Sequence, residues 1–192
     1  NPDTRIGAGR NLTMNQPNLT GGSAAVTLTA GNDVRLSSTN SGVSADLGSL
    51  QVEAGRDLIG VPQAGGFGIR AGSGNLALEA GRNVSLSGSG GGASLTAPSG
   101  AVRVTGSDVR ISGTSNVISG ATGTTVNATG GDVQLSATGG SNLEVRGGTG
   151  AATVNASNDV VMTAGGDIYL TSTQNQVKAG RDLSATSATT SS

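Results

Sequence analysis

The side chains in this chain that could do chemistry are carboxylates, because its 192 residues include no histidine and no cysteine. Asp33 and Asp57 occupy the same place in two copies of a short motif, and Glu53 and Glu79 each directly precede a copy. Two carboxylates on adjacent strands are the groups with which many enzymes hydrolyse sugars. Their identical places in a repeat favour a structural role, and the single Phe and single Tyr provide no aromatic platform for a sugar. We therefore expect no catalytic residue and no enzymatic activity.

Metal, cofactor and nucleic-acid sites are not expected either. Thiolate and imidazole ligands are absent, and so is the dense glycine-aspartate nonapeptide of calcium-binding repeats. Residues 66–71 and 72–77 match a loose dinucleotide-binding glycine pattern, but no helix is predicted after them, so we interpret both as loops. The 11 basic and 12 acidic residues are scattered along the chain, which argues against a nucleic-acid surface.

Asp33 and Asp57 belong to a five-residue motif, Ala-Gly-Xaa-Asp/Asn followed by an aliphatic residue, that recurs along the chain, with looser forms that begin with Thr105 and Thr129. Its glycines and its Asp or Asn residues are Gly9, Asn11, Gly31, Asp33, Gly55, Asp57, Gly81, Asn83, Gly106, Asp108, Gly130, Asp132, Gly165, Asp167, Gly180 and Asp182. The first six glycines are 22 to 26 residues apart, a period typical of stacked repeats. Glycine supplies positive φ and Asp or Asn bonds nearby backbone N–H groups, so we interpret the motif as a structural turn. Stacked copies predict a ladder of bonds between these side chains and backbone N–H groups.

Triplets of apolar, polar and apolar residues flank the turn, such as Val26-Thr27-Leu28 before Gly31 and Val34-Arg35-Leu36 after it. A period of two is that of a β-strand, in which successive side chains point to opposite faces. One turn type every 22 to 26 residues favours the corner of a solenoid over a hairpin, which would turn more often. A looser third strand is expected between units, at the following places: Val43 to Leu47, Ile69, Leu95, Val117-Ile118 and Val126.

These patterns predict an all-β solenoid of about eight coils, each of roughly 22–26 residues with three short strands. Disorder is disfavoured by the low net charge of -1 and by the regular spacing of the aliphatic residues. We expect residues 1–183 to form a single shaft and residues 184–192 to fray, because this tail contains no Val, Leu or Ile. Irregular spacing at Gly147–Gly150 predicts a protruding loop or a widened coil, and further loops are expected at 61–66 and 88–92.

The Ala-Gly-Arg-Asp-Leu and Ala-Gly-Asn-Asp-Val units, each followed by a strand triplet, resemble the haemagglutinin repeats of filamentous haemagglutinin. The same repeats build the shafts of contact-dependent growth inhibition exoproteins, and the resemblance covers about Ile6 to Leu183. It implies a right-handed parallel β-helix that is exported by two-partner secretion through an outer-membrane β-barrel partner. It also implies a secreted or bacterial cell-surface location and a role in adhesion and virulence, or in toxin delivery. Neither the family's amino-terminal secretion domain nor a toxin module is present in the sequence, so both roles stay open.

We therefore predict a structural shaft segment of a large surface filament that acts as a rigid spacer. Its expected partners are the outer-membrane secretion partner, flanking coils of the same polypeptide, and a receptor on a host cell or neighbouring bacterium. Unpaired strand edges at the ends also predict end-to-end self-association. One alternative is a β-helical carbohydrate-active enzyme, or tailspike-like depolymerase, that uses Glu53 and Glu79. The other is a segment that binds a receptor directly, through the Gly147–Gly150 region.

Overall fold

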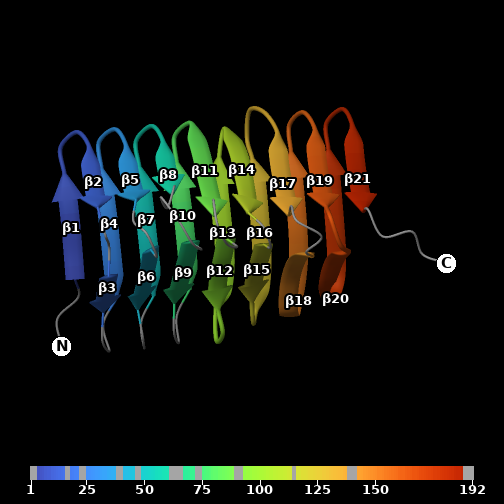
Figure 1. The fold of residues 1–192 in the computed structure, drawn as a ribbon, viewed down its shortest axis with the longest axis horizontal. Helices are drawn as coiled ribbons and strands as arrows, with labels where there is room; N and C mark the ends of the chain where they lie inside the picture. The colour runs from blue at the N-terminus through green and yellow to red at the C-terminus, as the bar shows by residue number, and fades with distance from the viewer. Residues whose placement is uncertain are drawn as a thin grey trace.

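The computed structural model describes residues 4–15, 18–21, 25–37, 41–45, 49–60, 67–71, 75–88, 93–113, 116–137 and 142–187. Every regular element within these ranges is a β-strand. The described chain accordingly offers no helix with the length and apolar character needed to cross a membrane. The strands wind into a stack of coils that runs from the N-terminal end to the C-terminal end (Figure 1).

Each coil contributes one strand to each of three faces, except the last, which has no third-face strand in the described residues. The first face contains β1 (Thr4–Ala8), β4 (Val26–Ala30), β7 (Leu50–Ala54), β10 (Leu76–Ala80), β13 (Ala101–Gly106), β16 (Gly123–Ala128) and the C-terminal parts of β18 (Leu143–Ala156) and β20 (Ile168–Ala179). The second face contains β2 (Leu12–Asn15), β5 (Val34–Ser37), β8 (Leu58–Gly60), β11 (Asn83–Gly88), β14 (Asp108–Gly113), β17 (Val133–Ala137), β19 (Val160–Ala164) and β21 (Leu183–Ser187). The third face contains β3 (Asn18–Gly21), β6 (Ser41–Ala45), β9 (Phe67–Ala71), β12 (Ala93–Ala97), β15 (Asn116–Gly120) and the N-terminal parts of β18 and β20.

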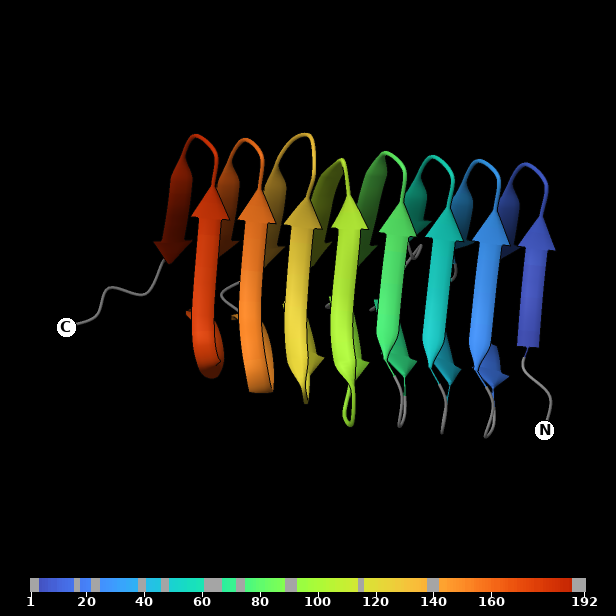
Figure 2. The same ribbon diagram turned by 180° about the vertical axis from the view of Figure 1, so that it is seen from behind.

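All strand pairings in the described residues are parallel, and each interior strand pairs with its equivalents in the coils before and after it. In Figure 2 the chain rises along the near, first face, crosses the top, and descends along the far, second face while it advances from right to left. This path is right-handed. The predicted right-handed parallel β-solenoid is therefore confirmed. The number of about eight coils is approximate, because the second face has eight strands and no third-face strand follows β21 in the described residues.

The core is a set of aliphatic stacks that run along the axis of the solenoid. Side chains along the interior strands alternate between buried and more exposed, as the triplet pattern predicts, whereas all residues of β21 at the end are exposed. One stack on the first face consists of side chains that are all 0% exposed, namely Leu28, Val52, Leu78, Val104, Val126 and Val154. Full burial of one such side chain is worth about 1.5–3 kcal/mol, so neighbouring coils supply most of the stability of each coil.

Val126 lies on a different face from the one that the sequence predicts. We expected it on the looser third strand, but it lies in β16 on the first face, stacked between Val104 and Val154. Thr124 explains the wrong prediction, because it hides the triplet pattern of this strand. Its side chain points inward and is 1% exposed, at a position where β4, β7, β10 and β13 have an aliphatic residue. Its hydroxyl donates to the carbonyl of Arg146 (2.5 Å) and accepts from the amide of Gly120 (3.0 Å). The buried hydroxyl therefore has both a hydrogen-bond acceptor and a hydrogen-bond donor as partners.

The irregular spacing at Gly147–Gly150 coincides with shifts of register and with no break in the strand. β18 runs through this region, and its register against β20 shifts between Arg146 and Gly148 and again between Gly148 and Ala151. Gly148 has a φ of 53°, a left-handed conformation that glycine adopts without strain. The predicted protruding loop is wrong, because β18 is continuous from Leu143 to Ala156, and the widened coil stays a prediction. The loop predicted at 61–66 lies outside the described residues. Of the loop predicted at 88–92, Gly88 is instead the last residue of β11, and 89–92 lie outside the described residues.

The C-terminal end of the solenoid extends a few residues past the predicted boundary at 183. β21 spans Leu183–Ser187 and pairs with β19 along its whole length. Residues 188–192, the rest of the tail that we expected to fray, lie outside the described residues.

Asn116 is a buried polar residue that holds two neighbouring coils together. Its side chain is 0% exposed, its amide nitrogen donates to the carbonyl of Ser136 (2.5 Å), and its Oδ1 accepts from the amide of Ala93 (3.2 Å). We expect Asn116→Leu to lower the free energy of unfolding by about 1–3 kcal/mol, because it leaves the buried amide of Ala93 and the partly buried carbonyl of Ser136 without these partners. Chemical denaturation measures this loss, and Ser119→Ala, an outward position on the same strand, is the control. A loss no larger than that of the control would contradict the assigned bonds.

Candidate functional site

Most of the predicted turn residues gather along one edge of the solenoid. We call this edge the first corner, where the chain passes from the first face to the second. It is made of residues 9–11, 31–33, 55–57, 81–83, 106–108, 130–132, 157–159 and 180–182. Gly165 and Asp167 lie elsewhere, between β19 and β20, where the second face meets the third. In the coil that contains β19, the first corner is formed instead by Ser157 and Asp159, which lie where other coils have the glycine and the Asp or Asn of the motif.

The glycines of the first corner are required by the close approach of neighbouring coils. The predicted reason, a positive φ, is wrong, because among the described glycines only Gly123 and Gly148 have one. A Cβ placed on Gly31, Gly55 or Gly81 would instead lie well within 3.0 Å of the backbone oxygen of the corner glycine one coil earlier. The motif therefore marks a point where backbone packs on backbone along the axis.

The Asp and Asn side chains of the first corner form a hydrogen-bonded ladder, as predicted. Each bond runs from the backbone N–H of one corner residue to the side-chain oxygen of its equivalent one coil earlier. The bonds are Asp33 to Asn11 (3.4 Å), Asn83 to Asp57 (3.2 Å), Asp132 to Asp108 (2.9 Å), Asp159 to Asp132 (3.2 Å) and Asp182 to Asp159 (3.3 Å). The carboxylates are thus occupied in joining coils, which is a structural use of the residues that first suggested chemistry.

Arginine in the motif adds a charged bridge between coils. The Nε of Arg56 donates to Asp33 (2.8 Å), its Nη2 also contacts Asp33, and the same Nε lies 3.2 Å from a carboxylate oxygen of Asp57. Arg181 contacts Asp159 in the same way, with its Nε 3.4 Å from Oδ1. In both cases the arginine reaches the acid of the preceding coil. The hydrogen bond from Arg56 and its positive charge lower the pKa of Asp33 below its ordinary value.

This lowered pKa gives a testable pH dependence. Because the folded pKa of Asp33 lies below the unfolded one, the pair stabilises the fold above the unfolded pKa, and this contribution is lost as pH falls through the folded pKa. We expect Arg56→Ala to raise the pKa of Asp33 towards the ordinary value of about 3.9, as measured by NMR titration of the carboxyl carbon. Arg181→Ala is the control and should leave Asp33 unchanged. An Asp33 pKa that stays low in Arg56→Ala would show that another group sets it.

Glu53 and Glu79 lie side by side, as neighbours in register on β7 and β10. Adjacent strands are about 4.8 Å apart, which is near the separation of about 5–5.5 Å between the carboxyl groups of retaining glycosidases. Glu53 also accepts a hydrogen bond from the amide of Gln51 on its own strand. Their side chains lie on the outer surface of the first face, and neither residue lines the groove described next.

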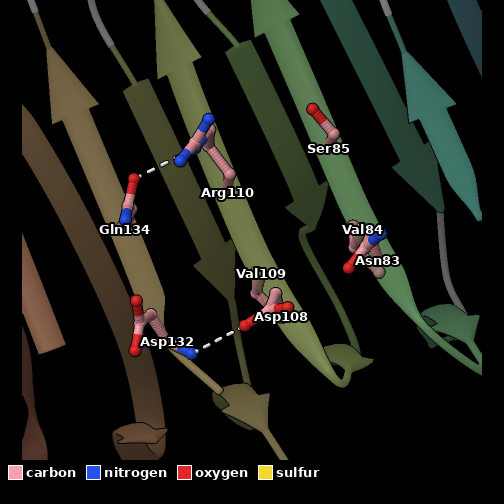
Figure 3. Close-up of a pocket in the computed structure, with 8 residues that line it drawn as sticks. All are labelled: Asn83, Val84, Ser85, Asp108, Val109, Arg110, Asp132 and Gln134. Atoms are coloured by element: carbon pink, nitrogen blue, oxygen red, sulfur yellow. Dashed lines mark hydrogen bonds between the residues drawn. The ribbon is translucent and has the colours of Figure 1, made fainter. Parts of the chain in front are cut away.

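A shallow groove of about 430 Å³ lies on the outer surface of β11, β14 and β17, beside the first corner (Figure 3). Its lining residues are Asn83, Val84, Ser85, Asp108, Val109, Arg110, Asp132 and Gln134. Arg110 donates from Nε to Oε1 of Gln134 (3.0 Å), and Asp108 accepts from the amide of Asp132 (2.9 Å). The sequence did not predict this groove, although Arg110 was expected to point outward.

The groove offers hydrogen-bonding groups that are already engaged within the solenoid. Its carboxylates serve the corner ladder, and Arg110 is held by Gln134. No group of three or more potential metal ligands occurs in the described part of the chain. The groove could hold a small polar molecule by its amides and charges.

Fold and surface together define a parallel β-solenoid with a polar ladder along one corner. No protein-family model matches the chain, and neither the curated proteins nor the solved structures contain a match to it. The solenoid class is therefore established by the strand pairing itself.

Proposed function

We propose that the chain is a structural shaft segment of a large secreted bacterial surface filament, acting as a rigid spacer. The observation that carries the proposal is the unbroken register of the second face, where one inward position runs from Leu12 in the first coil to Leu183 in the last. Each coil of the stack adds about 4.8 Å of length, so the reach of such a shaft is set by the number of its coils.

We propose the biological setting of the shaft from the resemblance of its repeats to those of filamentous haemagglutinin. The filamentous haemagglutinin-type motif occupies the first corner, a place where the backbones of neighbouring coils approach closely. In the proposed setting, the chain leaves the cell through an outer-membrane secretion partner and stacks on flanking coils of its own polypeptide. The filament then serves adhesion to a host-cell receptor or delivery of a toxin to a neighbouring bacterium. The described segment supplies distance and stiffness and carries out no chemistry.

Removal of one whole coil tests the spacer role. Deletion of residues 76–101 joins Asn75 to Val102, and Val102 takes the register position of Leu76. We expect the shortened chain to keep its β-sheet circular dichroism spectrum and a cooperative unfolding transition, with a modest loss of stability because one interface between coils is gone.

A deletion of half a coil is the matched control. Removal of residues 76–88 eliminates β10 and β11 and joins Asn75 to a segment that leads into the third face, so the three faces fall out of order. We expect this chain to lose its cooperative transition. If the whole-coil deletion also failed to fold, the coils would not be interchangeable units and the spacer proposal would be wrong.

A sugar-cleaving enzyme is the alternative with a specific observation behind it, the in-register pair Glu53 and Glu79. A panel of bacterial and host polysaccharides incubated with the protein tests this alternative. Cleavage that Glu53→Gln and Glu79→Gln both abolish would favour the enzyme. Cleavage that persists in both variants would point to a contaminant, and no cleavage would favour the shaft.

A further inference from the structure

Arginine side chains at the first corner bind the acids of neighbouring coils. Arg56 contacts Asp33 of the coil before and Asp57 of its own coil. Arg181 contacts Asp159 of the coil before. Both arginines hold the variable third place of the turn motif, between the glycine or its equivalent and the Asp. A guanidinium held by the acid of an adjacent coil is therefore a recurring arrangement of this solenoid.

The corner between β16 and β17 lacks this arginine. Its third place is Gly131, where a Cβ would lie well within 3.0 Å of the carboxylate of Asp108. The acid of the coil before thus fills the space that a side chain at this place would need. The coil therefore supplies no cation from residue 131.

Asp108 and Asp132 are consequently a pair of acids without an arginine. They lie in adjacent coils, in the places of the two acids that surround Arg56 in its corner. Oδ1 of Asp108 accepts from the amide of Asp132 (2.9 Å), and Oδ1 of Asp132 accepts from the amide of Asp159 (3.2 Å). The second oxygen of each acid has no partner among the described residues. Like charges on neighbouring strands repel each other, so a cation between these two acids is favourable.

The groove beside the first corner adds an anion-binding group to this acidic pair. The two acids lie at one end of the groove, and Arg110 and Gln134 lie at the other (Figure 3). Asp108 and Arg110 are two residues apart on β14, which separates them by about 6.5 Å along the strand. Nε of Arg110 donates to Gln134 (3.0 Å), and its two Nη atoms have no partner among the described residues. The Nη edge of a guanidinium binds a carboxylate through two parallel hydrogen bonds.

We propose that the groove binds an arginine with a free carboxylate, as the free amino acid or as the C-terminal residue of a peptide. Its guanidinium lies between Asp108 and Asp132, as that of Arg56 lies between the acids of its own corner. Its carboxylate bonds the Nη atoms of Arg110, and its extended side chain spans the two ends of the groove. The groove volume of about 430 Å³ lies in the usual range of small-molecule sites. The site belongs to three interior coils and is independent of the proposed spacer role.

Titration of the full chain with L-arginine, followed by backbone amide chemical shifts in NMR spectra, tests the proposal. We expect saturable shifts at the groove, with a dissociation constant on the order of 1 mM because exposed ion pairs are weak. L-Citrulline has a neutral urea in place of the guanidinium, and L-argininamide has a neutral amide in place of the carboxylate. Each should bind about fivefold more weakly or worse, since each loses one charge-assisted contact. No saturable shift with L-arginine, or equal binding of either analogue, would overturn the proposal.

The peptide acetyl-Gly-Gly-Arg distinguishes the two sources of the ligand. It presents the same guanidinium and carboxylate but has an amide in place of the free ammonium. Binding at least as tight as that of L-arginine identifies the C-terminal residue of a peptide as the ligand. Weaker binding identifies the free amino acid.

Two substitutions test the two ends of the groove separately. Asp132→Asn keeps an oxygen for the ladder, as Asn11 does where it accepts from Asp33, and should weaken L-arginine binding about fivefold or more. Arg110→Gln should abolish the preference for L-arginine over L-argininamide, because only the former carries the carboxylate. Asp33→Asn, which changes a ladder acid outside the groove, is the control and should leave the affinity unchanged. Wild-type affinity in Asp132→Asn, or a preference for L-arginine that persists in Arg110→Gln, would show that the assigned site is wrong.

Discussion

Substitution of Gly55 by alanine is expected to destabilise the solenoid by about 3 kcal/mol or more. The added methyl carbon would lie well within 3.0 Å of both the carbonyl carbon and the oxygen of Gly31. The obstacle is backbone, which cannot swing away as a flexible side chain would. Relief requires the two coils to move apart at the first corner, where Gly55 donates to the carbonyl of Ala30 (2.9 Å) and Arg56 donates to that of Asn32 (2.8 Å). The substitution therefore breaks several contacts at once.

Chemical denaturation of Gly55→Ala beside Gly68→Ala measures this effect. Both variants replace glycine by alanine within the repeat, but a Cβ on Gly68 meets nothing within 4 Å. We expect Gly68→Ala to stay within about 0.5 kcal/mol of the wild type. If the two variants lost the same free energy of unfolding, close packing of the corner would not be what demands glycine.

Truncation of Leu78 in the core is expected to cost about 2–5 kcal/mol in Leu78→Ala. The side chain is 0% exposed and lies in register between Val52 and Val104. Its removal costs the transfer energy of the lost methyl groups and leaves a cavity. Because β7, β10 and β13 are held by the same backbone pairing, the coils cannot collapse freely onto this cavity.

Ala77→Ser is the matched control for Leu78→Ala. Ala77 is the neighbouring residue on β10, and its side chain points outward, away from the stack. We expect the control to change the free energy of unfolding by less than about 0.5 kcal/mol. Calorimetry or urea denaturation separates the two variants, and a small loss in Leu78→Ala would mean that the aliphatic stack is not the source of stability.

The sequence predicted the architecture because each coil repeats the same local demands. Alternation in segments such as Val26-Thr27-Leu28 identifies strands, and a glycine-acid motif every 22 to 26 residues identifies corners. Repetition also implies register, since identical units stack best on one another. The ladder from Asp33 to Asn11 and its equivalents followed from the same reasoning and is confirmed.

Where the prediction was wrong, the missing information lay in contacts between coils. Thr124 breaks the aliphatic pattern of its strand, and only its bonds to Gly120 and Arg146 show how it is buried. The corner glycines were assigned a positive φ from the usual chemistry of turns. The structure shows that the carbonyl of the coil before, as for Gly55 on Gly31, excludes a side chain there. The groove beside Arg110 needs three adjacent strands, which no single repeat reveals.

The central claim, that each coil is one step of a stiff shaft, is tested most directly by distances between two spin labels. Arg35 and Ser184 hold equivalent outward places on β5 and β21 and are separated by six strand spacings on the second face. Electron–electron resonance on Arg35→Cys/Ser184→Cys should give one narrow distribution near about 29 Å, and deletion of residues 76–101 should shorten it by about 5 Å. A broad distribution, or a distance that the deletion leaves unchanged, would contradict the account.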